Sequence, residues 1–267
     1  NRSMGSPAND RSSQDRRQRS LRMQAVVLRH RDFGEADRML SLYSLQQGKI
    51  TAIAKGARKP GSRKAGHLEP FTNVSLQLAR GRDLMIVTQA ETIDAYLSLR
   101  EDLLLTTYAA YLVELMDRFT YEEGENRALY RALVNALERL DAGEPPDLVV
   151  RYYEMRLLDQ VGYRPKLFEC AQCEREIKAE DQFFSAERGG VLCPVCGKGS
   201  RDARPVSVAA LRFLRHFQRS SYQDARRAKL SRGVSREMES LMQYYLTYLL
   251  ERELHSPGFL DRLRRRG

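Results

Sequence analysis

Two short motifs, Cys170-Ala171-Gln172-Cys173 and Cys193-Pro194-Val195-Cys196, contain all four cysteines of the chain and are separated by nineteen residues. Each Cys-x-x-Cys pair can form a tight turn that directs two thiolates at one metal ion, and the intervening stretch is long enough to bring the second pair beside the first. This spacing predicts a zinc ribbon. Because four thiolates complete a tetrahedral shell, no position remains for water or substrate, and the expected single zinc ion is structural.

The segment between the two motifs predicts the hairpin of such a ribbon. Gln182–Ser185 and Gly190–Leu192 have the composition of short strands, and Arg188-Gly189-Gly190 supplies the turn. Basic residues around the cysteines would offset the negative charge of zinc bound by four thiolates. These residues are Lys166, Arg175, Lys178, Arg188, Lys198, Arg201 and Arg204. Two disulfides or a thioredoxin-like redox pair remain as alternatives, and the ribbon's role, in nucleic-acid binding, protein docking or stapling, stays open.

The net charge of +10 is unevenly distributed along the 267 residues. Residues 101–159 contain thirteen acidic and six basic residues, a net of −7, so the rest of the chain carries +17. A protein that binds a polyanion needs a basic face and tolerates an acidic back. The pattern therefore favours nucleic acid as the partner, with an anionic membrane surface as the second candidate.

The chain has no apolar run of transmembrane length and no signal-peptide pattern at its start. A soluble, cytoplasmic protein is expected, which agrees with cysteines kept reduced for metal. Residues 1–22 form a polar, basic leader that is expected to be disordered. Its Arg16-Arg17-Gln18-Arg19 run is either a flexible phosphate-binding arm or a solvated leader without a specific role.

Residues 23–98 predict a small closed β-barrel, because five short runs there have the composition and alternation of strands. The predicted strands are Met23–Arg29, Arg38–Ser44, Gly48–Lys55, Asn73–Arg80 and Leu84–Glu91. The period of two is clearest in Val74-Ser75-Leu76-Gln77-Leu78. An oligonucleotide-binding (OB) barrel fits this count, but periodicity alone leaves an SH3-like barrel open.

The longest break in the barrel region, residues 55–66, contains five basic residues and no acidic one. Its glycines let the backbone follow a phosphate path that the basic side chains neutralise, although a solvated, mobile loop is the alternative. It is not a Walker loop, because Ser62 stands where the lysine is required. Phe33, Tyr43 and Phe71 are the rings available for base stacking, but aromatic residues of a barrel are more often core.

Residues 99–165 and 206–267 predict a helical domain into which the ribbon, residues 166–205, is inserted. Apolar residues recur at helical spacing in Leu103–Met116, Asn126–Leu140 and Leu148–Val161. Pro205-Val206-Ser207 predicts the start of a further helix with Ser207 as its cap. The expected inward positions of that helix are Val208, Leu211, Leu214 and Phe217, and the opposite basic positions are Arg212, either Arg215 or His216, and Arg219. A last helix is expected to end near His255, before the basic run Arg264-Arg265-Arg266.

Signatures of common enzyme classes are absent. The chain has no His-Glu-x-x-His, no Gly-x-Ser-x-Gly, no complete dinucleotide-binding glycine motif and no Walker lysine. The four histidines are scattered, and the acidic residues form no cluster typical of a nuclease. These observations favour a binding protein. The rival interpretations are a zinc-ribbon docking adaptor whose basic loop is incidental, and a nucleic-acid enzyme with an unrecognised site.

The stretch from Gly34 to Arg63 resembles the opening of the RecO family of DNA-repair recombination mediators. The family pattern has a short strand before a Gly-Glu-x-Asp-like turn, then a Gly-Lys strand ending in Lys-Gly-Ala-Arg, and later two Cys-x-x-Cys pairs within helices. Gly34-Glu35-Ala36-Asp37, Gly48-Lys49 and Lys55-Gly56-Ala57-Arg58 match it in this order. The resemblance runs from about Met23 to about Leu263, and the basic leader is outside it.

This resemblance implies an OB barrel, a helical domain and an inserted zinc finger in a protein that binds single- and double-stranded DNA without sequence preference. It also implies annealing of complementary strands without ATP, and cooperation with RecR and with single-stranded DNA-binding protein (SSB), through the tail of SSB, to help RecA load. Some family members lack the full set of cysteines, so the metal would not be needed for the activity itself. The resemblance implies a cytoplasmic, nucleoid-associated protein.

The expected DNA contacts are basic residues that line or flank the barrel groove, together with the basic face of the later helix. They neutralise two strands at once, which lowers the repulsion between them. These residues are Lys49, Lys55, Arg58, Lys59, Arg63, Lys64, Arg80, Arg82, Arg212, Arg215 and Arg219.

Overall fold

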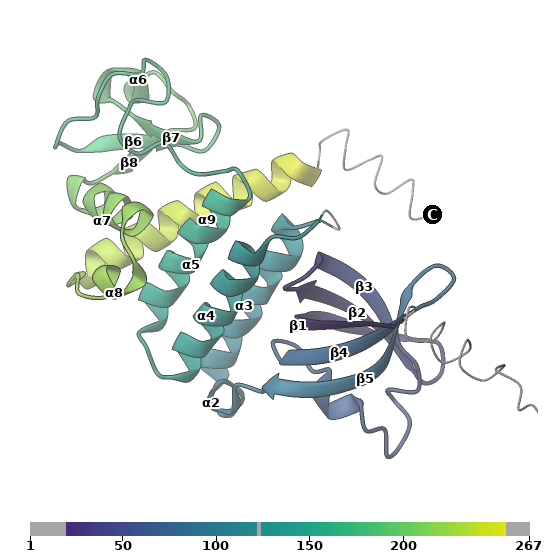
Figure 1. Ribbon diagram of the computed structural model, residues 1–267. Coiled ribbons are helices and arrows are strands. Elements are labelled where there is room, and N and C mark those ends of the chain that lie inside the picture. The colour runs from purple at the N-terminus through teal and green to yellow at the C-terminus, as the bar shows by residue number, and fades with distance from the viewer. Residues whose placement is uncertain (1–19, 122–123, 255–267) are drawn as a thin grey trace, which may run out of the picture. The chain divides into compact units, whose positions relative to one another are not determined.

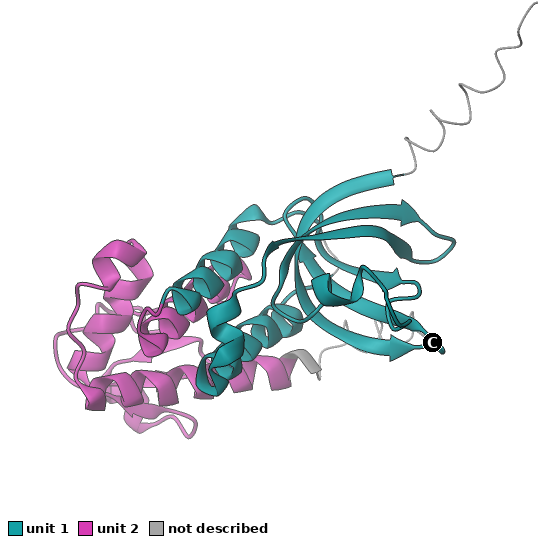
Figure 2. Ribbon diagram, turned by 90° about the horizontal axis from the view of Figure 1, so that it is seen from below, with its two compact units in different colours: residues 1–142 teal, residues 143–267 magenta. Residues whose placement is uncertain are grey.

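The computed structural model describes residues 20–121 and 124–254. Contacts divide the chain into two compact units, residues 1–142 and 143–267 (Figure 2). The predicted basic arm at residues 16–19 and the final arginine run at residues 264–266 lie outside the described residues. None of the described helices is both long enough and apolar enough to span a lipid bilayer.

The first unit contains a closed five-stranded barrel (Figure 1). Its strands are β1 (Ser20–Phe33), β2 (Asp37–Ser44), β3 (Gly48–Ala54), β4 (Asn73–Arg80) and β5 (Met85–Asp94). The order is β1-β2-β3-β5-β4, and β1 closes the barrel by pairing with both β2 and β4. The contact between β3 and β5 is parallel, whereas the other pairs are antiparallel. This order confirms the OB-like barrel.

Alternation along β4 explains how the barrel core forms. Val74, Leu76 and Leu78 have no exposed surface, whereas Ser75 and Gln77 between them are partly exposed. Successive side chains of a strand point to opposite faces, so this pattern places three residues in the core and two on the outer surface. β1 begins at Ser20, and the expectation that residues 20–22 are disordered is wrong, because Leu21 pairs with Leu78 and packs against the barrel core.

The helices of the first unit are α2 (Leu97–Glu101), α3 (Leu103–Phe119) and α4 (Arg127–Asp141), together with the short 3-10 helix η1 (Ala65–His67). Asp102 caps α3 by accepting hydrogen bonds from the backbone N–H groups of Leu104 and Leu105. The sequence pattern predicts α3 and α4 but not α2. Five residues are too few to show a helical period, which explains the omission.

The second unit contains α5 (Pro146–Gln160), α7 (Val208–Arg219), α8 (Tyr222–Ala225) and α9 (Arg232–Leu254). Between α5 and α7 lies the ribbon, with β6 (Gln182–Ser185), β7 (Gly190–Leu192), α6 (Pro194–Lys198) and β8 (Arg204–Val206) in a sheet of order β7-β6-β8. The predicted hairpin of β6 and β7 is confirmed, and Gly189 in its turn has a φ of 65°.

The helix predicted after Pro205 is confirmed with Ser207 as its cap, but the residues just before the cap form a strand that was not predicted. Arg204–Val206 pairs with β6 as a strand, and Ser207 then caps α7 by accepting a hydrogen bond from the backbone N–H of Ala210. Val208, predicted to face inward, is 39% exposed because it lies in the first turn of α7, whereas Leu211, Leu214 and Phe217 are buried as predicted.

Candidate nucleic-acid interface and metal centre

The four cysteines of the ribbon lie together. Their Sγ atoms are all within 4.8 Å of one another, and Cys173 Sγ lies 3.9 Å from Cys193 Sγ. Zinc–sulfur bonds of about 2.3 Å in a tetrahedron place the sulfur atoms about 3.8 Å apart, whereas a disulfide requires about 2 Å. The donor set and its spacing therefore fit one zinc ion bound by Cys170, Cys173, Cys193 and Cys196, and the four thiols are free of disulfides.

Backbone hydrogen bonds position the two cysteine pairs. The N–H of Glu174 donates to the carbonyl of Cys170 at 2.9 Å, and the N–H of Gly197 donates to that of Cys193 at 2.8 Å, which closes each turn. Hydrogen bonding from the backbone of Arg175 is the main cause that lowers the pKa of Cys173 to about 6. The turn therefore favours the thiolate, the form that binds metal.

A groove of about 720 Å³ lies on the outer surface of the barrel. We call it the barrel groove. Strands β1, β4 and β5 bound it on one side. The end of the basic loop (residues 55–66), together with η1, bounds it on the other. Its lining residues are Arg22, Arg63, Lys64, His67, Ser75, Leu76, Gln77, Thr88, Gln89, Ala90 and Glu91. Three of them are cationic and one, Glu91, is anionic, so the groove has a positive balance that suits a polyanion.

Hydrogen bonds hold the basic side of the barrel groove in place. Lys64 Nζ donates to the backbone oxygen of Lys55 at 2.9 Å and to that of Val87 at 3.2 Å, which fastens the loop to β5. His67 Nδ1 accepts the backbone N–H of Thr92 at 3.2 Å, so Nε2 carries the hydrogen in this arrangement. Hydrogen bonds between the loop and β5 therefore hold the groove wall.

The remaining cations of the basic loop differ in their surroundings. Arg58 Nη2 lies 3.2 Å from Asp32 Oδ2, and Nη1 donates to the backbone oxygens of Gly34 and Glu35 at 3.4 and 3.3 Å. Arg58 thus anchors the loop to the β1–β2 hairpin. By contrast, the exposed Lys55, Lys59 and Arg63 form no ion pair with any carboxylate of the described residues. Their charges are available to an outside partner.

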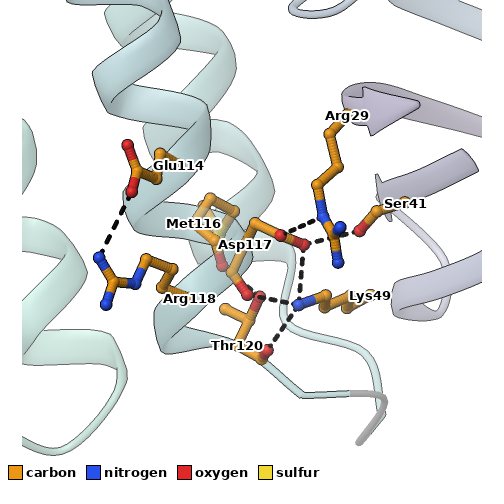
Figure 3. A network of polar contacts seen from close by, with 8 residues as sticks. All are labelled: Arg29, Ser41, Lys49, Glu114, Met116, Asp117, Arg118 and Thr120. Atoms are coloured by element: carbon orange, nitrogen blue, oxygen red, sulfur yellow. Dashed lines mark hydrogen bonds and ion pairs between the residues drawn. The ribbon is translucent and has the colours of Figure 1, made fainter. Parts of the chain in front are cut away.

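Lys49, another predicted DNA contact, lies at the joint between the barrel and α3 (Figure 3). Its Nζ is 2.9 Å from Asp117 Oδ1 and also donates to the backbone oxygens of Asp117 and Thr120. Ser41 donates to Asp117 at 2.7 Å, and Arg29 lies 2.6 Å from it. OB barrels commonly bind nucleic acid on the face of strands 2 and 3. In this protein α3 contacts part of that face.

The other predicted cations lie outside the barrel groove. Arg80 and Arg82 are exposed on the β4–β5 hairpin, and Arg212 is exposed on α7 in the second unit. Arg215 Nε donates to the backbone oxygen of Leu167 at 2.8 Å, so this side chain joins α7 to the ribbon. Arg219 stacks on the ring of Phe168, with its guanidinium carbon 3.4 Å from the centroid.

The three candidate stacking rings differ in their exposure to solvent. Tyr43 and Phe71 are 2% and 6% exposed and belong to the core, as expected for barrel aromatics, whereas Phe33 is 45% exposed. Burial raises the pKa of Tyr43 to about 12, which agrees with its position.

Only Arg63 and Lys64 of the groove lining are among the predicted contacts, and the structure adds Arg22, His67, Gln77 and Gln89 as polar groove residues that were not predicted. Leu21 and Met23 flank Arg22 and continue the apolar alternation of β1, so extending that strand by one repeat would place Arg22 on its outer surface. Nothing in the local pattern marks His67, because its position depends on the path of the loop.

Known proteins match the chain over nearly its whole length. The family model "Recombination protein O N terminal" matches residues 19–96, and "Recombination protein O C terminal" matches residues 100–257. The chain is 42% identical over 248 residues to the DNA repair protein RecO of Roseiflexus sp. (strain RS-1), covering 93% of this chain and 87% of the relative. It is 37% identical to the protein of the same name from Dehalococcoides mccartyi (strain BAV1), covering 91% and 96% of the two chains. The chain therefore belongs to the RecO family.

Proposed function

We propose that this protein is a DNA-repair recombination mediator that binds single- and double-stranded DNA without sequence preference and anneals complementary strands. The observation that carries the proposal is the barrel groove with its positive balance. Lys55 and Lys59 of the basic loop continue it, and neither forms an ion pair with a carboxylate within residues 20–121 and 124–254. Membership of the RecO family makes DNA the expected polyanion. The activity is binding and needs neither ATP nor a catalytic residue.

The mechanism is electrostatic. Lys55, Lys59 and Arg63 pair with phosphates of one strand and release its counterions, while Arg22 and Lys64 border the groove that receives the backbone. A strand whose charge is neutralised repels its complement less, so that bases meet more often. Gln77 and Gln89 can donate and accept hydrogen bonds at the groove surface without selecting one base.

The partners in this proposal follow from the family. The protein works with RecR to help RecA load onto single-stranded DNA coated by SSB, at the cytoplasmic nucleoid. The exposed Arg212 and Arg219 of the second unit remain proposed DNA contacts, and the helices of that unit are proposed to bind the acidic and apolar tail of SSB. The ribbon takes a structural zinc ion on its four cysteines, which stabilises the fold of that unit and takes no part in annealing.

The test is annealing of two complementary labelled oligonucleotides by the intact protein, without ATP, bare and coated with SSB, over a salt series. We expect acceleration that survives coating and fades as salt rises. The informative variant combines Lys55→Ala, Lys59→Ala and Arg63→Ala. If all three contact phosphate, the slope of log affinity against log salt for single-stranded DNA falls by about 2.

A matched control removes three exposed arginines of the same unit from the acidic helical region, as Arg118→Ala, Arg127→Ala and Arg131→Ala. Its net charge equals that of the loop variant, so a general charge effect would weaken both proteins equally. The proposal fails if the two variants bind alike, or if the wild-type protein does not accelerate annealing. The latter result, with tight binding of a protein partner, would favour the docking-adaptor interpretation.

A further inference from the structure

Phe33 presents an aromatic ring to solvent at the tip of the β1–β2 hairpin. It is the last residue of β1, and Gly34 follows it with a φ of 57°. With 45% of its surface exposed, it is the most exposed aromatic residue among residues 20–121 and 124–254. The proposed electrostatic mechanism gives this ring no role.

The hairpin tip is fastened to the basic loop by several bonds from different atoms. Arg58 N–H donates to the backbone oxygen of Ala36 at 2.9 Å, and its guanidinium contacts Asp32 as well as the Gly34 and Glu35 backbone. The N–H of Gly56 donates to Asp37 Oδ1 at 2.7 Å. The ring is therefore held next to the start of the same loop whose other end forms the wall of the barrel groove.

The charges near the tip favour an anionic occupant. The four cations Arg31, Lys55, Arg58 and Lys59 outnumber the three carboxylates of the tip, Asp32, Glu35 and Asp37. Of these carboxylates, Asp32 pairs with Arg58 and Asp37 accepts the N–H of Gly56. An apolar ring beside free cations is the combination by which proteins bind unpaired bases, because the base stacks on the ring while the cations hold the flanking phosphates.

We propose that Phe33 is a stacking platform for one unpaired base of a single strand that continues along the basic loop to the barrel groove. This inference rests on the proposed DNA binding. It adds a physical reason why the protein would bind a single strand more tightly than a duplex. In a duplex each base is already stacked between its neighbours, so the ring gains nothing there, and only the phosphate contacts remain.

The first experiment compares wild type with Phe33→Leu, which keeps an apolar side chain but removes the flat ring. We expect the affinity for a mixed-sequence single strand to fall by about 5-fold or more, with an unchanged salt slope because no charge is removed. Affinity for the matching duplex, and for a strand of abasic sites with the same phosphates, should stay at the wild-type level. Leu97→Ala is the control, since Leu97 is an exposed apolar residue of α2.

A second experiment uses the fact that the chain contains no tryptophan. Phe33→Trp introduces a single indole whose fluorescence should be quenched by the mixed single strand and not by the abasic strand. Equal affinity of wild type and Phe33→Leu for the mixed strand, with no quenching in Phe33→Trp, would overturn the inference while leaving the proposed function intact. Failure of the wild-type protein to bind any of the three nucleic acids would instead reject the proposed function.

Discussion

Lys49 Nζ lies 2.9 Å from Asp117 Oδ1, and the two side chains are only 13% and 14% exposed. The pair joins the second residue of β3 to the last turns of α3, and Arg29 and Ser41 complete the contacts of the carboxylate (Figure 3). A lysine that belongs by sequence to the basic set is thereby neutralised inside its own unit. Its role in the structure is to hold α3 against the barrel.

Removing the ammonium of Lys49 should destabilise the first unit without changing DNA recognition. Lys49→Met leaves the largely buried Asp117 carboxylate with two partners, so we expect the free energy of unfolding to fall by about 2 kcal/mol. Urea denaturation measures this change, and Lys55→Met, which alters an exposed lysine of the same charge, should leave stability almost unaffected. A DNA salt slope lowered by Lys49→Met in the folded protein would contradict this assignment.

Lowering the pH should weaken the contact that Asp117 makes between α3 and the barrel. Burial alone would raise the pKa of Asp117, but hydrogen bonds from Ser41 and Lys49 and the charges of Lys49 and Arg29 outweigh burial and hold the pKa below its ordinary value. A carboxylate with a lowered folded-state pKa stabilises the fold above its unfolded pKa of about 3.9, and this contribution is lost as the pH falls through the folded value.

The measurement for this pH effect is the urea midpoint of wild type and Asp117→Asn from neutral to acid pH. Wild type should be the more stable near pH 7, and the difference should shrink as the pH falls below about 4. A difference independent of pH would mean that the side chain acts through packing and not through its charge.

Two pairs of arginines distinguish the barrel groove from the rest of the barrel surface. Arg22→Ala with Arg63→Ala removes two cations that line the groove, so the single-strand salt slope should fall by about 1.4. Arg80→Ala with Arg82→Ala removes the same charge from the β4–β5 hairpin, outside the groove lining. We expect a smaller loss from the hairpin pair in fluorescence-anisotropy titrations, and equal losses would show that binding is spread over the barrel.

Loss of the zinc site should lower the stability of the second unit without affecting strand annealing. Cys173→Ser should abolish the expected content of one zinc ion per chain, because a structural site needs all four donors. Val195→Ser is the matched control, since Val195 lies inside the second cysteine pair and is 74% exposed. Zinc content is measured by elemental analysis. The free energy of unfolding of the second unit should fall, and a loss of strand annealing by folded, zinc-free protein would contradict the division of roles between the units.

The local sequence pattern was sufficient to predict the elements that depend only on residue types and their spacing along the chain. The alternation from Val74 to Leu78 predicted a barrel strand, and the spacing from Cys170 to Cys196 predicted the cysteine cluster, because both depend on distances along the chain. The short strand β8 was not predicted. It has only three residues, and its pairing partner, β6, lies more than twenty residues earlier in the chain.

The roles of individual cations required the tertiary structure. By sequence alone, Lys49, Lys64 and Arg63 are equivalent basic residues. In the structure Lys49 pairs with Asp117, Lys64 fastens the loop to β5, and Arg63 lines the groove without an ion pair to any carboxylate of the part of the chain that the structure describes. The barrel, the ribbon and the net positive charge follow from local pattern and composition. Only the fold decided which charges stay unpaired and which ring, Phe33 rather than Phe71, meets solvent, because pairing and burial depend on residues that are distant in the chain.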